Sequence, residues 1–166
     1  MGKNRFFGKY YKFINNDGFS FAFITSHSNE GDMLQIITHD GVVYLNDPSM
    51  ITINDNEISF NVITDNLTIT GQLSLGELHP LKHKVMGPFT YLPLECSHDI
   101  YSMYHKVNGE LKVNNKLISF NDGLGYIEGD KGVNFPTKYI WYNSLLNDVT
   151  VTLAIATIPM GLINFI

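Results

Sequence analysis

The sequence is poor in cysteine and in charge, and each shortage excludes a class of protein. Cys96 is the single cysteine, so no internal disulfide bond can form and nothing indicates an oxidising compartment. Charged residues make up only 16% of the 166 residues, and 11 basic residues are outnumbered by 16 acidic ones. Because nucleic acids are bound through clustered basic side chains, this composition predicts no nucleic-acid partner. The expected location is the cytoplasm.

Targeting signals and cofactor motifs are also missing. The N-terminal stretch "MGKNRFFGKYYKFINNDG" lacks the apolar run of a signal peptide, and Phe6 stands where a myristoylation signal has Ser or Thr. No phosphate loop, dinucleotide fingerprint or nucleophile elbow is present, so no cofactor is predicted. His79 and His83 have the spacing of a metal-binding pair on a helix, but Pro80 between them indicates a loop, and no metal site is predicted.

Long stretches with the apolar period of a helix are absent as well, and short β-rich runs take their place. Turn residues separate these runs at regular intervals, at positions 15–18, 40–41, 54–56, 65–66, 108–109 and 114–115. Residues 79–99 hold three prolines and are expected to form an irregular crossing. The sequence therefore predicts an all-β, antiparallel domain, either a barrel or a two-sheet sandwich, with few short helices.

Apolar residues are plentiful: they make up 44% of the chain, and aromatic residues reach 13%. The length fits one domain with a large apolar interior, so residues 1–166 are predicted to be a single β domain. Residues 149–166 carry no charge and are long enough for a membrane helix. The β-branched residues Val149 to Thr152, with Pro159 and Gly161, favour a buried pair of strands, and a peripheral membrane contact is the alternative. Because the chain stops within this apolar run, the last strand is expected to pair with another copy or with further sequence.

Three segments, taken together, resemble the tocopherol cyclase-like family, which is related more distantly to carotenoid hydratases of the hydroxyneurosporene synthase type. The segments are "MGPF" (86–89), "LECSHDIYSMYHKVNG" (94–109) and "GLGYIEGDKGVNFPTKYIW" (123–141). The resemblance implies a lipocalin-like β-barrel. It also implies that this chain is the N-terminal half of a longer protein with two barrel halves.

The resemblance further implies an activity, in which a prenyl double bond is protonated and a phenol oxygen or water captures the cation. A carboxyl group in an apolar pocket keeps its proton because desolvation raises its pKa. The candidate catalytic residues are Glu128, Asp130, Glu95 and His98. Aromatic faces stabilise a cation, and the candidate substrate-binding residues are Tyr126, Phe135, Tyr139 and Trp141. The prenyl chain is expected in the barrel interior.

Other interpretations of the same residues stay open. Cys96 beside His98 has the residue types of a nucleophile and its base, yet no oxyanion-type glycine turn accompanies them, and a buried cysteine near a polar histidine is the favoured interpretation. Residues 128–132 have the composition of a tight glycine turn with solvated acids. The family often has Trp where this chain has Lys131, and a "QCN"-like run where it has "YNSLL".

Three functions therefore compete. The first is an enzyme, a cyclase or hydratase acting on an isoprenoid double bond. The second is a non-catalytic carrier or sensor of a lipid or isoprenoid. The third is a structural β-module that forms a homo-oligomer through its C-terminal strand. The first two predict a hydrophobic small molecule as the partner.

Overall fold

The computed structural model describes residues 5–146, 149–160 and 163–165, and most of them lie in antiparallel strands. The strands are β1 (Phe6–Ile14), β2 (Ser20–Ser28), β3 (Gly31–Thr38), β4 (Gly41–Leu45), β5 (Ile51–Ile53), β6 (Glu57–Ile63), β7 (Thr68–Leu75), β8 (Cys96–Val113), β9 (Lys116–Gly132), β10 (Tyr139–Leu145), β11 (Thr150–Ala156), β12 (Ile158–Met160) and β13 (Ile163–Phe165). Two short 3-10 helices, η1 (Pro48–Met50) and η2 (Gly87–Tyr91), are the helical elements of the described chain. The predicted all-β class is confirmed.

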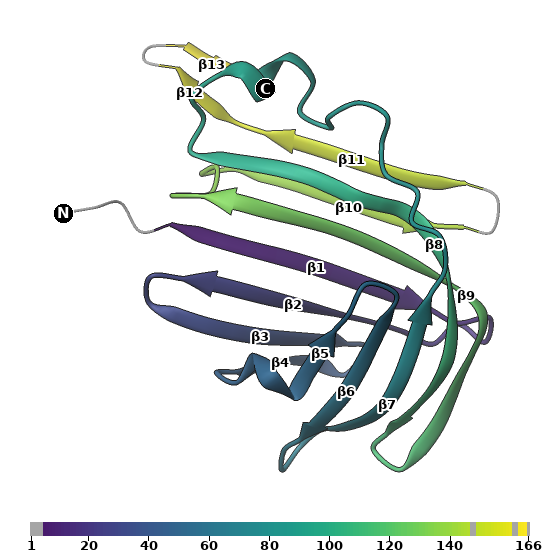
Figure 1. Ribbon diagram of the computed structural model, residues 1–166. Helices are drawn as coiled ribbons and strands as arrows, with labels where there is room; N and C mark the ends of the chain where they lie inside the picture. The colour runs from purple at the N-terminus through teal and green to yellow at the C-terminus, as the bar shows by residue number, and fades with distance from the viewer. Residues whose placement is uncertain (1–4, 147–148, 161–162, 166) are drawn as a thin grey trace.

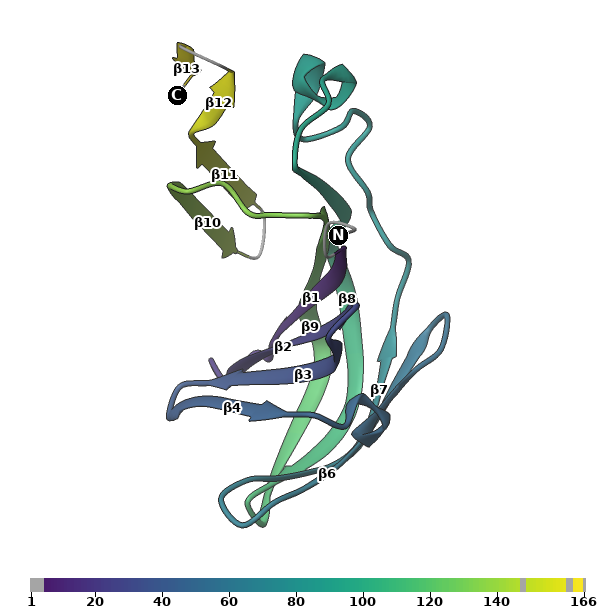
Figure 2. The same ribbon diagram turned by 90° about the vertical axis from the view of Figure 1, so that its left-hand side faces the viewer.

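Nine strands form one open sheet in the order β4-β3-β2-β1-β9-β8-β7-β6-β5 (Figure 1). The sheet is strongly curved, as Figure 2 shows, and the curvature brings distant strands together. The ring of Phe60 on β6 lies 5.7 Å from the rings of both Phe21 and Phe23 on β2, although four strands separate β2 from β6 in the sheet. Burial of these rings on the inner surface forms the main hydrophobic core.

The predicted turns between β1 and β7 are confirmed, and so is the turn at Asn114–Asn115, where both residues have positive φ. The predicted turn at Asn108–Gly109 is wrong, because β8 runs straight through it. Gly109 has a φ of 132° and marks a register shift of β8 against β9. A glycine with positive φ serves a β-bulge as well as a turn, and here it bends a long strand without reversing it.

The acidic glycine turn considered for residues 128–132 is also absent, since β9 continues to Gly132 and the chain reverses at residues 133–138. The irregular crossing expected at residues 79–99 is confirmed for residues 79–95, which contain no strand and hold η2, whereas residues 96–99 already belong to β8.

The C-terminal part forms strands, as predicted. β10 and β11 make a hairpin, and β12 pairs with β13. The last strand therefore has a partner in its own chain, and β11 is largely exposed where a buried pair was expected. Residues 161–162 and 166 of the predicted segment lie outside the described part. None of the described helices is long and apolar enough to cross a membrane.

Candidate functional site

Two hydrophobic clusters lie on opposite sides of β1, the C-terminal part of β9 and the N-terminal part of β8. Side chains alternate along a strand, so Ile127 packs into the main core while its neighbours Tyr126 and Glu128 point the other way. We call this second side the hairpin face, because β10 and β11 cover it. The register places Tyr10 of β1 opposite Glu128 and His98 of β8 opposite Asp130. Strand pairing therefore brings acids from one strand beside a histidine and a tyrosine from its two neighbours.

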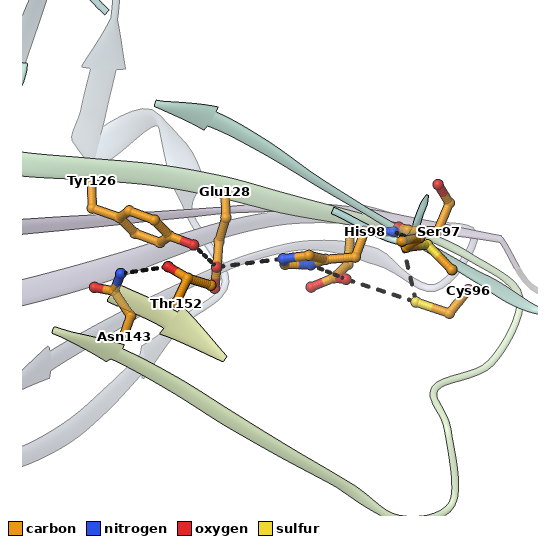
Figure 3. Close-up of polar contacts among 9 residues, drawn as sticks. Cys96, Ser97, His98, Tyr126, Glu128, Asn143 and Thr152 are labelled. Carbon is orange, nitrogen blue, oxygen red and sulfur yellow. Dashed lines mark hydrogen bonds and ion pairs between the residues drawn. The ribbon is translucent and has the colours of Figure 1, made fainter. Parts of the chain in front are cut away.

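Glu128 is the centre of a buried polar network (Figure 3). Only 6% of the surface of Glu128 is exposed to solvent. Tyr126 Oη donates a hydrogen bond to Glu128 Oε2 at 2.5 Å, and His98 Nε2 lies 3.6 Å from the same oxygen. Burial raises the pKa of Glu128 to about 7, although the Tyr126 hydrogen bond and the charge of His98 oppose the rise. The carboxyl group therefore keeps its proton to a higher pH than an exposed carboxyl group does.

His98 connects Glu128 to the protein surface. Its Nδ1 donates to Asp130 Oδ1 at 2.8 Å, and the Asp130 side chain is 30% exposed. Burial disfavours the charged imidazole, but the hydrogen bond and charge of Asp130 outweigh it, and the pKa of His98 is raised. Cys96 Sγ lies 3.8 Å from Asp130 Oδ1, and burial with the nearby carboxylate raises the pKa of the thiol to about 12. A thiol that keeps its proton is a poor nucleophile, so the structure favours an inert cysteine, although Cys96 is half-buried and not fully buried as expected.

The β10–β11 hairpin closes over this network with apolar and aromatic contacts. Trp141 meets the His98 ring edge-to-face at 4.4 Å. Leu145 is buried in the same cluster as Ile100 and Tyr126. Glu128 is therefore enclosed by hydrophobic side chains, which is the physical reason for its raised pKa.

Polar contacts fasten the hairpin as well. The Thr152 hydroxyl hydrogen-bonds with Tyr126, and Asn143 Nδ2 donates to Thr152 Oγ1 at 3.0 Å. Lys12 Nζ donates to the Asn143 carbonyl oxygen at 3.2 Å and to Asn143 Oδ1 at 3.3 Å. A continuous chain of contacts thus runs from Lys12 through the hairpin to Tyr126 and Glu128.

Five predicted site residues come together: Glu128, Asp130, His98, Tyr126 and Trp141. The other three lie elsewhere. Glu95 is exposed ahead of β8, where its carbonyl oxygen accepts the backbone N–H of Val133 at 2.8 Å. Phe135 is exposed and stacks on Phe6 at 4.5 Å, and exposed Tyr139 lies beside it.

Lys131 follows Asp130 in a regular part of β9, so it lies on the opposite side of the strand and is exposed. An aromatic residue at that position would not face Glu128.

Several residues of the network were not predicted from the sequence: Tyr10, Lys12, Asn143 and Thr152. Burial and the charge of Glu128 raise the pKa of Tyr10 to about 12, so it remains a neutral phenol beside the acid. Tyr10 and Lys12 reach the site because β1 pairs with β9, and Asn143 and Thr152 reach it because the β10–β11 hairpin folds over that pair of strands. No local motif marks any of them.

A second polar pair lies on the core side of β8. His105 is fully buried, and its Nδ1 lies 3.0 Å from Ser102 Oγ. The Ser102 hydroxyl donates to the carbonyl oxygen of Tyr104 at 2.7 Å, so Nδ1 carries the hydrogen shared with Ser102. Burial lowers the pKa of His105 to about 4, and the ring is a neutral part of the core.

The expected ligand position in the barrel interior is not supported. The inner surface of the curved sheet is filled by core side chains, including Phe13, Phe23 and Leu34, none of which is exposed. A hollow of about 520 Å³ lies where turns of the sheet meet, near residues 15–20, 38–40 and 113–119, away from Glu128. Among the described residues, no cluster of three or more His, Cys, Asp or Glu side chains is arranged to hold a metal ion.

Comparison with known proteins identifies no family for this chain and gives a distant structural likeness. No protein-family model matches the chain, and no curated protein matches it. One similar solved structure, from Nitrosomonas europaea, is of a protein provisionally assigned as AttH. It shares 11% sequence identity with this chain at a TM-score of 0.44, and the match covers 94% of this chain and 60% of the other. This chain thus spans less than two thirds of that protein, and a likeness of this degree carries no information about activity or ligand.

Proposed function

We propose that the protein binds a hydrophobic isoprenoid or lipid at the hairpin face and that Glu128 is the general acid that acts on it. The observation that carries this proposal is the enclosed Glu128 carboxyl group, with a pKa of about 7, in contact with Tyr126 and His98. A general acid works best when its pKa lies near the working pH, because it is then both protonated and ready to release the proton. Enclosed carboxyl groups of this kind are frequent in active sites.

The chemistry follows from the arrangement of protons. Glu128 transfers its proton to one carbon of a prenyl double bond, which leaves a tertiary cation and a carboxylate. The phenol oxygen of the substrate, or a water molecule, then bonds to the cation and releases a proton. His98 returns a proton to Glu128 from the side of Asp130, which is partly exposed. No electrons are exchanged, so the step needs neither an oxidant nor a reductant.

The surroundings of Glu128 suit an isoprenoid. The apolar residues that pack around Tyr126 belong to β1, β8, β9 and the crossing before β8, and they are Tyr10, Ile14, Val85, Ile100, Met103 and Leu124. Tyr126 and Trp141 present aromatic rings near the acid, and such rings attract cations. The resemblance to the tocopherol cyclase-like family suggests the prenyl double bond as the reacting group.

Substrate entry requires the hairpin to move. Leu145 and Trp141 pack against the same cluster that surrounds Glu128, so the described conformation is closed. The polar contacts of Lys12 and Asn143 are few, and breaking them frees the hairpin from β1. Loops and hairpins that close over a site commonly limit substrate binding and product release.

The test is turnover of a prenylated quinol by the wild-type chain and by Glu128→Gln, which keeps the shape of the side chain and removes the acidic proton. We expect a loss of about 10²–10⁴-fold in kcat, the usual contribution of a general acid. Glu77→Gln is the matched control, because Glu77 is exposed and is not among the residues that pack around Tyr126. Equal turnover by wild type and Glu128→Gln would remove Glu128 from the mechanism.

Binding without turnover would instead support the carrier. Native mass spectrometry of the purified protein would then show a retained apolar ligand that Glu128→Gln also retains. Absence of both turnover and binding would contradict the proposal as a whole.

A further inference from the structure

The side of the β10–β11 hairpin that points away from Glu128 is an uncovered apolar surface. The register pairs Ile140 with Ile155 and Tyr142 with Leu153 across the hairpin. Together with Val151, all of these side chains are exposed, with Ile140 at 60%. We call these five residues the apolar stripe. Figure 2 shows the hairpin standing beside the main sheet, with no described element on this side of it.

The apolar stripe is a contiguous row of four aliphatic side chains and one tyrosine. Single exposed hydrophobic residues are ordinary, but a contiguous row on a two-stranded sheet usually marks an interaction site. The opposite side of the same hairpin is closed by Trp141 and Leu145 against the main sheet. A hairpin that buries one face and exposes an equally apolar second face has the pattern of a strand pair lying between two layers.

Charge identifies the kind of partner. The described hairpin residues, 139–146 and 149–157, include no Lys, Arg, Asp or Glu, whereas the whole chain has a net charge of −5. When two identical chains meet about a two-fold axis, the same patch lies on both sides of the contact, so a patch with charges of one sign repels its own copy. A surface free of charge is what a chain with net negative charge needs in order to meet its own copy. Anionic membranes, by contrast, are bound through basic residues, and the stripe has none.

We propose that the apolar stripe is the contact surface for a second copy of this chain, with the two hairpins packed face to face about a two-fold axis. The same residues then serve on both sides of the contact, so each substitution acts twice. The contact lies on the side of the hairpin opposite Glu128, and its formation does not depend on the function proposed for that residue. Pairing of the copies covers the hairpin from outside and holds it over the acid.

Sedimentation equilibrium of the full chain over a wide range of concentration tests the proposal. Wild type is expected to show a monomer–dimer equilibrium. Ile140→Glu places two carboxylates near the axis and is expected to raise the dissociation constant of the dimer by about tenfold or more. Leu153→Glu is expected to act in the same way, and circular dichroism checks that both variants keep their strands. Ile63→Glu is the matched control, because Ile63 is 62% exposed on β6 and lies outside the stripe.

Mixing Ile140→Glu with Ile140→Lys provides the decisive arm. Opposite charges across the axis are expected to restore the dimer in the mixture, while each variant alone remains monomeric. A wild-type chain that is monomeric at every concentration would overturn the proposal, and so would a dimer that Ile63→Glu weakens as much as Ile140→Glu does. Monomers that instead sediment with vesicles of neutral lipid would assign the stripe to a membrane. Because mass is measured without substrate, this result is independent of turnover by Glu128.

Discussion

His98 Nε2 lies 3.6 Å from Glu128 Oε2, and that nitrogen is buried without a hydrogen-bond partner. The pKa values of both residues are raised, that of Glu128 by burial and that of His98 by Asp130. Both groups therefore hold a proton at higher pH than they would in water, and they titrate as a coupled pair. In the proposed function Glu128 gives up the proton and His98 restores it.

The buried carboxyl group makes stability depend on pH. A carboxyl group whose pKa is raised on folding holds a proton that the unfolded chain has already released, so the free energy of unfolding falls as pH rises. The window runs from the ordinary pKa of Glu to about 7, and the loss across it is about 3 kcal/mol. The raised pKa of His98 acts in the same direction above the ordinary pKa of His. The lowered pKa of His105 acts in the opposite direction, but only below the ordinary pKa of His. Urea unfolding at about pH 6.5 and about pH 8 should therefore show the wild-type chain less stable at the higher pH.

Glu128→Gln provides the comparison. It has no proton to lose, so most of the difference between the two pH values should disappear. If the variant kept the full wild-type difference, Glu128 would not be the group that titrates.

The Lys12 contact with the hairpin predicts a local effect on dynamics. Lys12→Met keeps the apolar stem and removes two hydrogen bonds to Asn143, each of which contributes about 1 kcal/mol. Hydrogen exchange followed by mass spectrometry should show faster exchange in β10 and β11, with little change in β2 and β3. Lys116→Met is the control, because Lys116 is exposed at the start of β9. Unchanged protection of the hairpin would mean that its apolar contacts alone hold it closed.

The close approach of β9 to His105 predicts a large cost for a single methyl group. A Cβ added at Gly125 would lie 2.2 Å from His105 Nε2, and that ring is fully buried and held by Ser102. Gly125→Ala should therefore lower the free energy of unfolding by about 2 kcal/mol or more, because overpacking forces the ring or the backbone to shift. Gly8→Ala is the control, since its Cβ would make ordinary contacts of 3.7 Å. Thermal unfolding of the two variants measures the difference, and similar melting temperatures would contradict the steric explanation.

Much of the fold can be predicted from the sequence because its turns are local. Asn114 and Asn115 have positive φ, and asparagine is one of the residue types that tolerate this conformation in tight turns. The glycines of "GLGYIEGDKG" mislead for a physical reason. Gly129 and Gly132 lie within β9, where an added Cβ would come 2.7 Å from the Gly8 carbonyl oxygen and 2.1 Å from that of Glu95. Glycine permits a close backbone approach as well as a reversal of the chain, and the residue type alone does not separate the two.

The candidate site shows the same limit. The types of Glu128, Asp130 and His98 suggest acid chemistry, and the structure places them together. Lys12 joins the network because β1 pairs with β9, which brings together residues more than a hundred positions apart. Thr152 joins it because the β10–β11 hairpin folds back over Tyr126. Neither periodicity nor spacing in the sequence encodes these contacts.

Ile127 and Glu128 are neighbours in the chain, yet one belongs to the main core and the other to the polar network beneath the hairpin. A single peptide bond therefore connects the main core to the polar network. A shift of Glu128 would displace Ile127, which is packed in the main core. The core therefore fixes the position of the Glu128 carboxyl group. Any movement that the proposed site needs must therefore come from the hairpin. Substitutions in the hairpin can change the ligand specificity of that site without shifting the carboxyl group of Glu128.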